Sequence, residues 1–84
     1  MNYYDLGFQS AGAIVEIHIS PCSTMLRLMN ASNFALCRGG LGYSYYGGRA
    51  KSSPVRLAIP SHGHWYLVVE PSGTIQISVR VVSN

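Results

Sequence analysis

The residues best suited to bind a ligand lie together in the middle of the chain. Between residues 38 and 51, five glycines are interleaved with tyrosines and cationic side chains. Glycines let a backbone approach a phosphate closely, tyrosine rings stack on bases, and cationic side chains pair with phosphate oxygens. We therefore predict a site for a small anionic, nucleotide-derived ligand, either a cyclic or a linear nucleotide, formed by Arg38, Tyr43, Tyr45, Tyr46, Arg49 and Lys51.

This pattern has a structural interpretation as well. The glycines do not have the spacing of a phosphate-binding loop. The alternative is an edge region in which the tyrosines cover the core and bind nothing.

Two histidines follow at His62 and His64. Residues two apart on a strand point to the same face, as a metal-binding pair would require. The preferred interpretations are that His62 or His64 is a hydrogen-bonding turn residue or contacts the phosphate of the ligand, and we include both among the predicted ligand-binding residues. A zinc site needs three or four ligands. His18 is a third imidazole, but carboxylates are scarce and the cysteines lack ligand spacing. We therefore predict no metal site and no cofactor.

The carboxylates and hydroxyls offer little for catalysis. Asp5, Glu16 and Glu70 are the three acidic residues of the chain, and paired-carboxylate chemistry requires two of them to converge. Ser61 and His62 are adjacent but have no acid nearby in the sequence to orient the imidazole. We predict no catalytic residue, and a binding module in place of an enzyme.

The amino-acid composition narrows the classes of partner that this protein is expected to bind. The 84 residues form one domain, 1–84, and only 11% are charged, against about 25% in an average globular chain. Such a neutral surface favours a homo-oligomer, although a monomer with a Ser-, Gly- and Tyr-rich surface has the same composition. No acidic residue occurs from Ile17 to Val69, a stretch that contains five cations. Because the charged residues of this segment are all cationic, it favours an anionic partner. The alternative is that the cations are simply solvated.

Two cysteines do not make a disulfide framework, although a single Cys22–Cys37 bridge is an alternative to two free thiols. The chain opens without a signal-peptide pattern and has no run of 18 apolar residues. We expect a cytoplasmic protein that does not enter a membrane.

Short runs of β-forming residues, broken about every ten residues by Gly, Pro, Asn or Ser, are typical of a sandwich or barrel. We predict an all-β fold: a small antiparallel, jelly-roll-like β-sandwich of six or seven strands with at most one helical turn. That turn would lie between Asn30 and Gly40, capped by Asn30 or Ser32, and Gly47-Gly48 would be a turn or hinge. The expected strands are 3–8 with a bulge at Gly7, 13–19, 24–29, an edge strand ending near 46, 55–59, 64–70 and 74–82, the last two forming a hairpin.

One long run is distinctive: Tyr45-Tyr46-Gly47-Gly48-Arg49-Ala50-Lys51-Ser52-Ser53-Pro54-Val55-Arg56-Leu57, then Pro60 and Gly63-His64-Trp65-Tyr66-Leu67-Val68-Val69. With Tyr4-Asp5-Leu6-Gly7 at the start and Ser78-Val79-Arg80-Val81 at the end, it resembles a family of short bacterial proteins known as a domain of unknown function (number eighteen eighty-three). The resemblance implies a small β-sandwich. Some members are attached to TIR domains, which implies an association with nucleotide signals in immunity against phage. No catalytic residue is carried over.

These observations lead to one functional prediction with two alternatives. We predict a non-enzymatic, homo-oligomeric module that binds or sequesters a small anionic, nucleotide-derived ligand. The first alternative is a protein–protein interaction domain without a small ligand. The second is binding of single-stranded nucleic acid, which the low net charge of +3 argues against.

Overall fold

Strands form where β-branched and aromatic residues alternate with polar ones, and one short helix interrupts them. The computed structural model describes residues 2–20, 24–71 and 76–82. These residues contain, in chain order, β1 (Asn2–Gln9), β2 (Ile14–Ser20), β3 (Thr24–Asn30), α1 (Ala31–Arg38), β4 (Tyr46–Ala50), β5 (Val55–Ala58), β6 (Gly63–Pro71) and β7 (Gln76–Val82).

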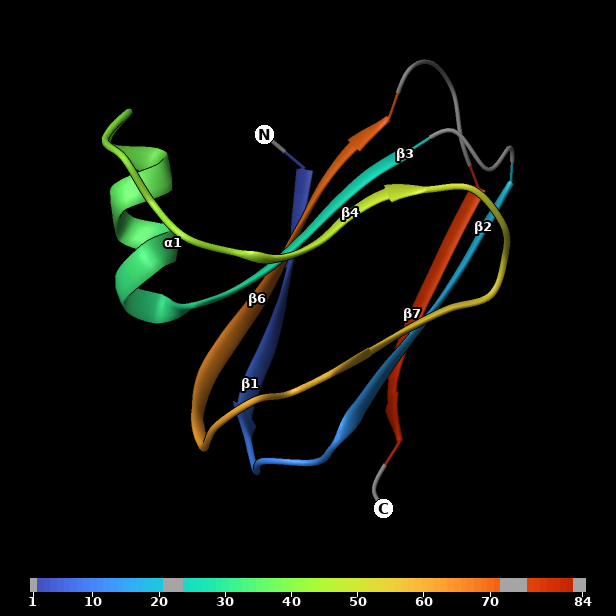
Figure 1. Ribbon diagram of the computed structural model, residues 1–84, viewed down its shortest axis with the longest axis horizontal. Helices are drawn as coiled ribbons and strands as arrows, with labels where there is room; N and C mark the ends of the chain where they lie inside the picture. Colours follow the sequence, from blue (N-terminus) through green and yellow to red (C-terminus); the bar gives the residue numbers. More distant parts are fainter. Residues whose placement is uncertain (1, 21–23, 72–75, 83–84) are drawn as a thin grey trace.

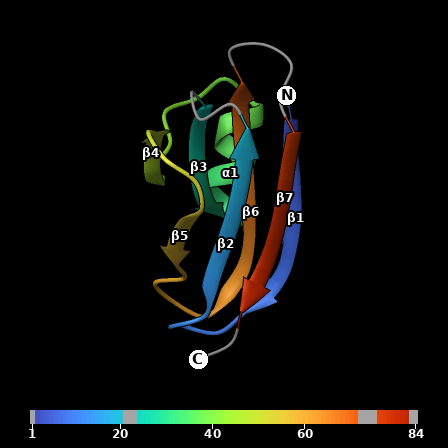
Figure 2. The same ribbon diagram turned by 90° about the vertical axis from the view of Figure 1, so that its right-hand side faces the viewer.

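The strands build two antiparallel sheets that pack face to face (Figure 1). One is a four-stranded sheet in the order β1-β6-β3-β4, and the other is a three-stranded sheet in the order β5-β2-β7. Figure 2 shows the three-stranded sheet in front, with β7 and β1 along one side of the sandwich and β5 and β4 along the other. The predicted all-β sandwich is confirmed.

The core lies between the sheets because each strand turns alternate side chains inward. Trp65 is its largest fully buried residue, and its indole N–H donates to the carbonyl of Ser61 at 2.9 Å. Burying an aliphatic or aromatic side chain of this kind contributes roughly 1.5–3 kcal/mol. The other core residues on the strands are Val15, Ile17, Ile19, Leu26, Leu28, Ala50, Leu67 and Val69.

A second, smaller cluster lies on the outer face of the four-stranded sheet, under α1. It consists of Met29, Phe34 and Val68. Asn30 caps the helix, since its Oδ1 accepts the backbone N–H of Asn33 at 3.0 Å. The helix is longer than the single turn that the sequence predicts, because it starts directly at the end of β3 and buries Phe34 against the sheet. No helix in the described part of the chain is long and apolar enough to cross a membrane.

The bulge predicted at Gly7 is present. The β1–β6 register shifts between Asp5 and Gly7, and Gly7 has φ +71°. The backbone N–H of Gly7 donates to Asp5 Oδ1 at 2.9 Å, which fixes the bulge.

Gly47-Gly48 was predicted as a turn or hinge, and this is wrong. Both glycines lie within β4, where Gly47 is opposite Arg27 and Gly48 is opposite Leu26. A Cβ on Gly47 would stand 2.5 Å from the Leu26 carbonyl oxygen, and its φ is +122°. The glycines are therefore needed for a close approach between two strands and not for a change of direction.

The hairpin predicted from the last two strands is also wrong. β6 pairs with β1 and β3, whereas β7 pairs with β2 in the other sheet. β6 and β7 therefore belong to different sheets. The turn predicted at Pro71-Ser72-Gly73 lies largely outside the described residues.

Candidate anion-binding site

An unusual carboxylate lies in the middle of the outer face of the three-stranded sheet. Val15 and Ile17 on β2 face the core, so Glu16 between them faces outward. Its side chain is nevertheless only 7% exposed. The reason is the cross-strand register: Glu16 is directly opposite Arg56 on β5 and Arg80 on β7.

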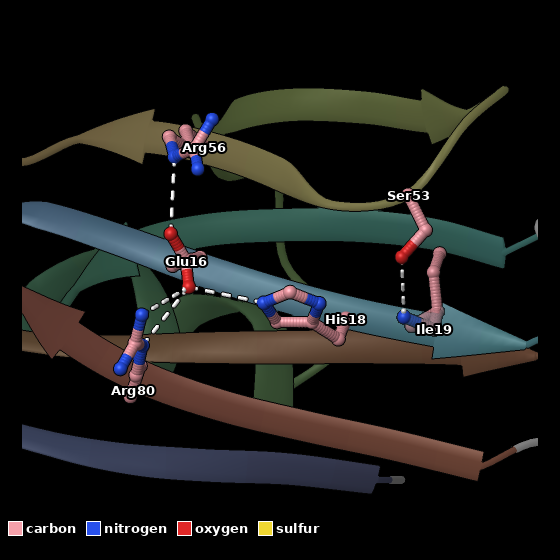
Figure 3. Close-up of polar contacts among 6 residues, drawn as sticks. All are labelled: Glu16, His18, Ile19, Ser53, Arg56 and Arg80. Atoms are coloured by element: carbon pink, nitrogen blue, oxygen red, sulfur yellow. Dashed lines mark hydrogen bonds and ion pairs between the residues drawn. The ribbon is translucent and has the colours of Figure 1, made fainter.

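Three cationic or basic side chains surround this carboxylate (Figure 3). Arg56 Nε donates to Oε2 at 3.0 Å. Arg80 donates to Oε1 through Nε at 2.9 Å and through Nη2 at 2.8 Å. His18 Nε2 lies 3.0 Å from the same Oε1. We call Glu16, His18, Arg56 and Arg80 the Glu16 cluster.

The cluster keeps Glu16 ionised over a wide pH range. Hydrogen bonds from His18, then Arg80 and Arg56, lower the pKa of the Glu16 carboxyl to about 2, against the opposing effect of burial. The one carboxylate and the two guanidiniums together contribute a net charge of +1 to the cluster.

The guanidinium groups are anchored but not covered. The side chains of Arg56 and Arg80 are 63% and 69% exposed. Arg56 contacts the carboxylate through Nε, and Arg80 through Nε and Nη2. A guanidinium has five N–H donors. Further donors on both arginines are therefore directed away from Glu16, toward solvent.

A cavity of about 380 Å³ borders the cluster at His18. Its polar lining comes from β2, β7 and the segment before β5: His18, Ser20, Ser53, Gln76 and Ser78. Ser53 Oγ accepts the backbone N–H of Ile19 at 3.0 Å (Figure 3). Its own O–H remains a donor, so the cavity offers hydroxyl, amide and imidazole groups and meets the Glu16 cluster at His18.

The residues predicted as a ligand site from the sequence lie elsewhere, and they divide into separate groups. Tyr43 and Tyr45 follow α1, with ring centroids 6.0 Å apart, and the Arg27 guanidinium lies 5.3 Å from the Tyr45 ring. A hydrogen bond with Cys37 raises the pKa of the Tyr43 hydroxyl. The Arg38 guanidinium lies 5.7 Å from the Phe34 ring. These residues form one group around the helix.

A second group lies at the β4 edge of the four-stranded sheet. Tyr46 has its ring 6.1 Å from that of Trp65, toward the inter-sheet space. Arg49 helps to line a second cavity, of about 390 Å³, between β4 and β5. Lys51 is exposed just beyond β4.

The two histidines do not share a strand. His62 is exposed in the bend before β6, whereas His64 lies on β6. His64 Nε2 is 2.6 Å from Asp5 Oδ1, and its ring stacks on Tyr66 with centroids 4.8 Å apart. The hydrogen bond from the Gly7 N–H, followed by that from His64, lowers the pKa of Asp5. His64 is therefore held by structural contacts.

Sequence reasoning missed Glu16, Arg56 and Arg80 as a group. Each was placed on a strand, and both arginines on the face opposite the apolar residues. The missing information was which strands are neighbours, since the three residues are separated by 40 and 24 positions. The sequence did contain one relevant signal: all three residues occupy polar positions in strands where apolar and polar residues alternate.

The fold and the Glu16 cluster define a small β-sandwich domain with an arginine-rich outer face. The chain belongs to the family described as Domain of unknown function (DUF1883), whose family model matches residues 1–84. No curated protein and no solved structure matches the chain.

Proposed function

We propose that this domain is a non-enzymatic binding module for a small anionic, nucleotide-derived ligand, held on the outer face of the three-stranded sheet. Its phosphate would pair with Arg56 and Arg80, and its sugar hydroxyls would enter the cavity beside His18. The observation that carries the proposal is the anchoring of two exposed guanidiniums by one buried carboxylate.

Anchoring matters because it lowers the cost of binding. A free arginine loses side-chain entropy when it captures a ligand, about 0.5–1.5 kcal/mol for each ordered side chain. Here Glu16 has already fixed both side chains. Arginine N–H groups also match phosphate oxygens in pairs, which gives shorter and stronger hydrogen bonds than neutral donors give.

The negative charge of Glu16 does not prevent this. The carboxylate is 7% exposed and lies beneath the guanidiniums, so an approaching anion meets N–H donors first. The adjoining cavity, at about 380 Å³, falls within the roughly 300–1,000 Å³ of small-molecule sites. Its serines and Gln76 suit the hydroxyls of a ribose.

The sheet face is a better candidate than the tyrosine region. Arg38 lies over the Phe34 ring, and Tyr46 lies beside Trp65, so the cations and tyrosines predicted to converge are spread over two parts of the four-stranded sheet. The Glu16 cluster, by contrast, has two guanidiniums on one carboxylate. Binding by the tyrosine region stays a prediction, and one experiment separates the two sites.

That experiment is calorimetric titration with inorganic phosphate and with linear and cyclic nucleotides. We expect Arg56→Gln and Arg80→Lys to weaken binding at least tenfold. The matched controls are Arg38→Gln and Tyr45→Ala, which should bind as the parent does. If the controls lose binding and the sheet variants do not, the ligand binds at the tyrosine region and not on the three-stranded sheet. No binding of any compound by the parent would reject the proposal.

A further inference from the structure

The outer edge of β7 is the most regular free strand edge in the described part of the fold. All seven residues of β7 pair with β2 without a register shift, and its other side pairs with no described strand. The remaining edges are less suited to pairing. β1 contains the bulge at Gly7, β4 contains two glycines with positive φ, and β5 has only four residues. A regular edge of this kind, with unpaired backbone N–H and C=O groups along it, is a template for another strand.

We propose that a second copy of this chain pairs with β7 through its own β7, antiparallel and about a two-fold axis at Val79. The two three-stranded sheets then become one continuous six-stranded sheet. In this register Val79 faces its own symmetry mate, Ile77 faces Val81, Ser78 faces Arg80 and Gln76 faces Val82. All seven residues of each strand are paired.

Side-chain orientation, charge and the full pairing of Gln76–Val82 together favour this register. Opposite residues in an antiparallel pair lie on the same face, so Ile77, Val79 and Val81 must stay together on the inner layer. These three are half-buried within one copy and pack at the margin of the core. Moving the axis to Arg80 would place two arginines opposite each other, whereas an axis at Val79 places each Arg80 against a neutral serine.

Pairing would complete the ligand site, an extension that rests on the function proposed above. Ser78 lines the cavity and is directly opposite His18. The Arg80 of the second copy would stand on the other side of Ser78, about 4.5–5.5 Å away between Cβ atoms. Its Nε and Nη2 are occupied by its own Glu16, and Nη1 would face the cavity. Each cavity then has a guanidinium donor from the other copy.

The test measures the mass of the protein in solution by analytical ultracentrifugation and native mass spectrometry, without ligand. We expect a dimer at micromolar concentration. Ser78→Arg puts like charges opposite in both symmetry-related contacts, and Ser78→Glu puts opposite charges there. The dimer dissociation constant should rise with the first and fall with the second, each by roughly 2- to 30-fold. Ser32→Arg, exposed on α1 at the outer face of the other sheet, is the matched control.

The outcomes are distinguishable. A monomer at all concentrations, or a dimer on which both Ser78 variants act alike, refutes pairing through β7. A dimer that responds as expected but binds no nucleotide leaves the pairing intact and rejects the function. A cross-link between Gln76→Cys and Val82→Cys, in a background with Cys22 and Cys37 replaced by serine, independently reports the register.

Discussion

Replacing Thr24 by valine is expected to stabilise the domain. Thr24 lies on β3 on the inner side of the four-stranded sheet, is 0% exposed, and its Oγ1 has no hydrogen-bond partner among the described residues. A buried hydroxyl without a partner costs about 1–3 kcal/mol in lost hydration. Valine keeps the β-branched shape and removes this cost. For a domain of this size, each 1 kcal/mol raises Tm by roughly 4–8 °C.

The assay is urea unfolding followed by the fluorescence of Trp65, the single tryptophan, which is 2% exposed and reports on the core. Thr24→Val should raise the midpoint without changing the slope, since the surface exposed on unfolding is the same. Thr24→Ser is the control. It keeps the hydroxyl and loses a methyl group, and should cost about 1 kcal/mol. If valine destabilises the domain as much as serine does, the hydroxyl has a partner and the reasoning is wrong.

Three further results are expected. Because the pKa of Glu16 is lowered to about 2, its contribution to stability is complete above pH 4.5 and is lost as the pH falls toward 2, so Glu16→Gln should flatten the acid part of a plot of urea midpoint against pH. Gly47→Ala should destabilise more than Gly48→Ala in urea unfolding, because a Cβ at residue 47 meets the Leu26 carbonyl at 2.5 Å whereas one at residue 48 meets nothing within 4 Å; equal losses would contradict this. Asn30→Ala should cost about 0.5–2 kcal/mol in thermal unfolding through loss of the helix cap, and Asn30→Asp should largely retain it.

The strands of this domain were predictable because alternation records which side chains face a core. Val15, Ile17 and Ile19 alternate with Glu16 and His18, and the same pattern marks β5 and β7. Alternation does not record which sheet a strand joins, so the last two strands were wrongly paired. Local turn chemistry failed at Gly47-Gly48 because pairing with β3 outweighs the tendency of two glycines to turn.

The candidate site was less predictable, for a related reason. The sequence predicts a site around Tyr45 because tyrosines and cations lie close together along the chain there. The cluster that the fold builds draws Glu16, Arg56 and Arg80 from three strands. The sequence shows these three residues only as separate outward-facing polar positions. They can be recognised as one cluster only once β2 is known to lie between β5 and β7.

The order of strands also has a kinetic consequence. Of the described strands, only β3 and β4 are neighbours both along the chain and within a sheet. β1 pairs with β6, and β2 pairs with β5 and β7, so most strand pairs join segments that are far apart in the sequence. Domains dominated by such distant contacts fold in milliseconds to seconds, far more slowly than helical bundles. During synthesis, β1 and β2 would emerge without partners. The four-stranded sheet would be complete only once β6 had emerged, and the three-stranded sheet only once β7 had.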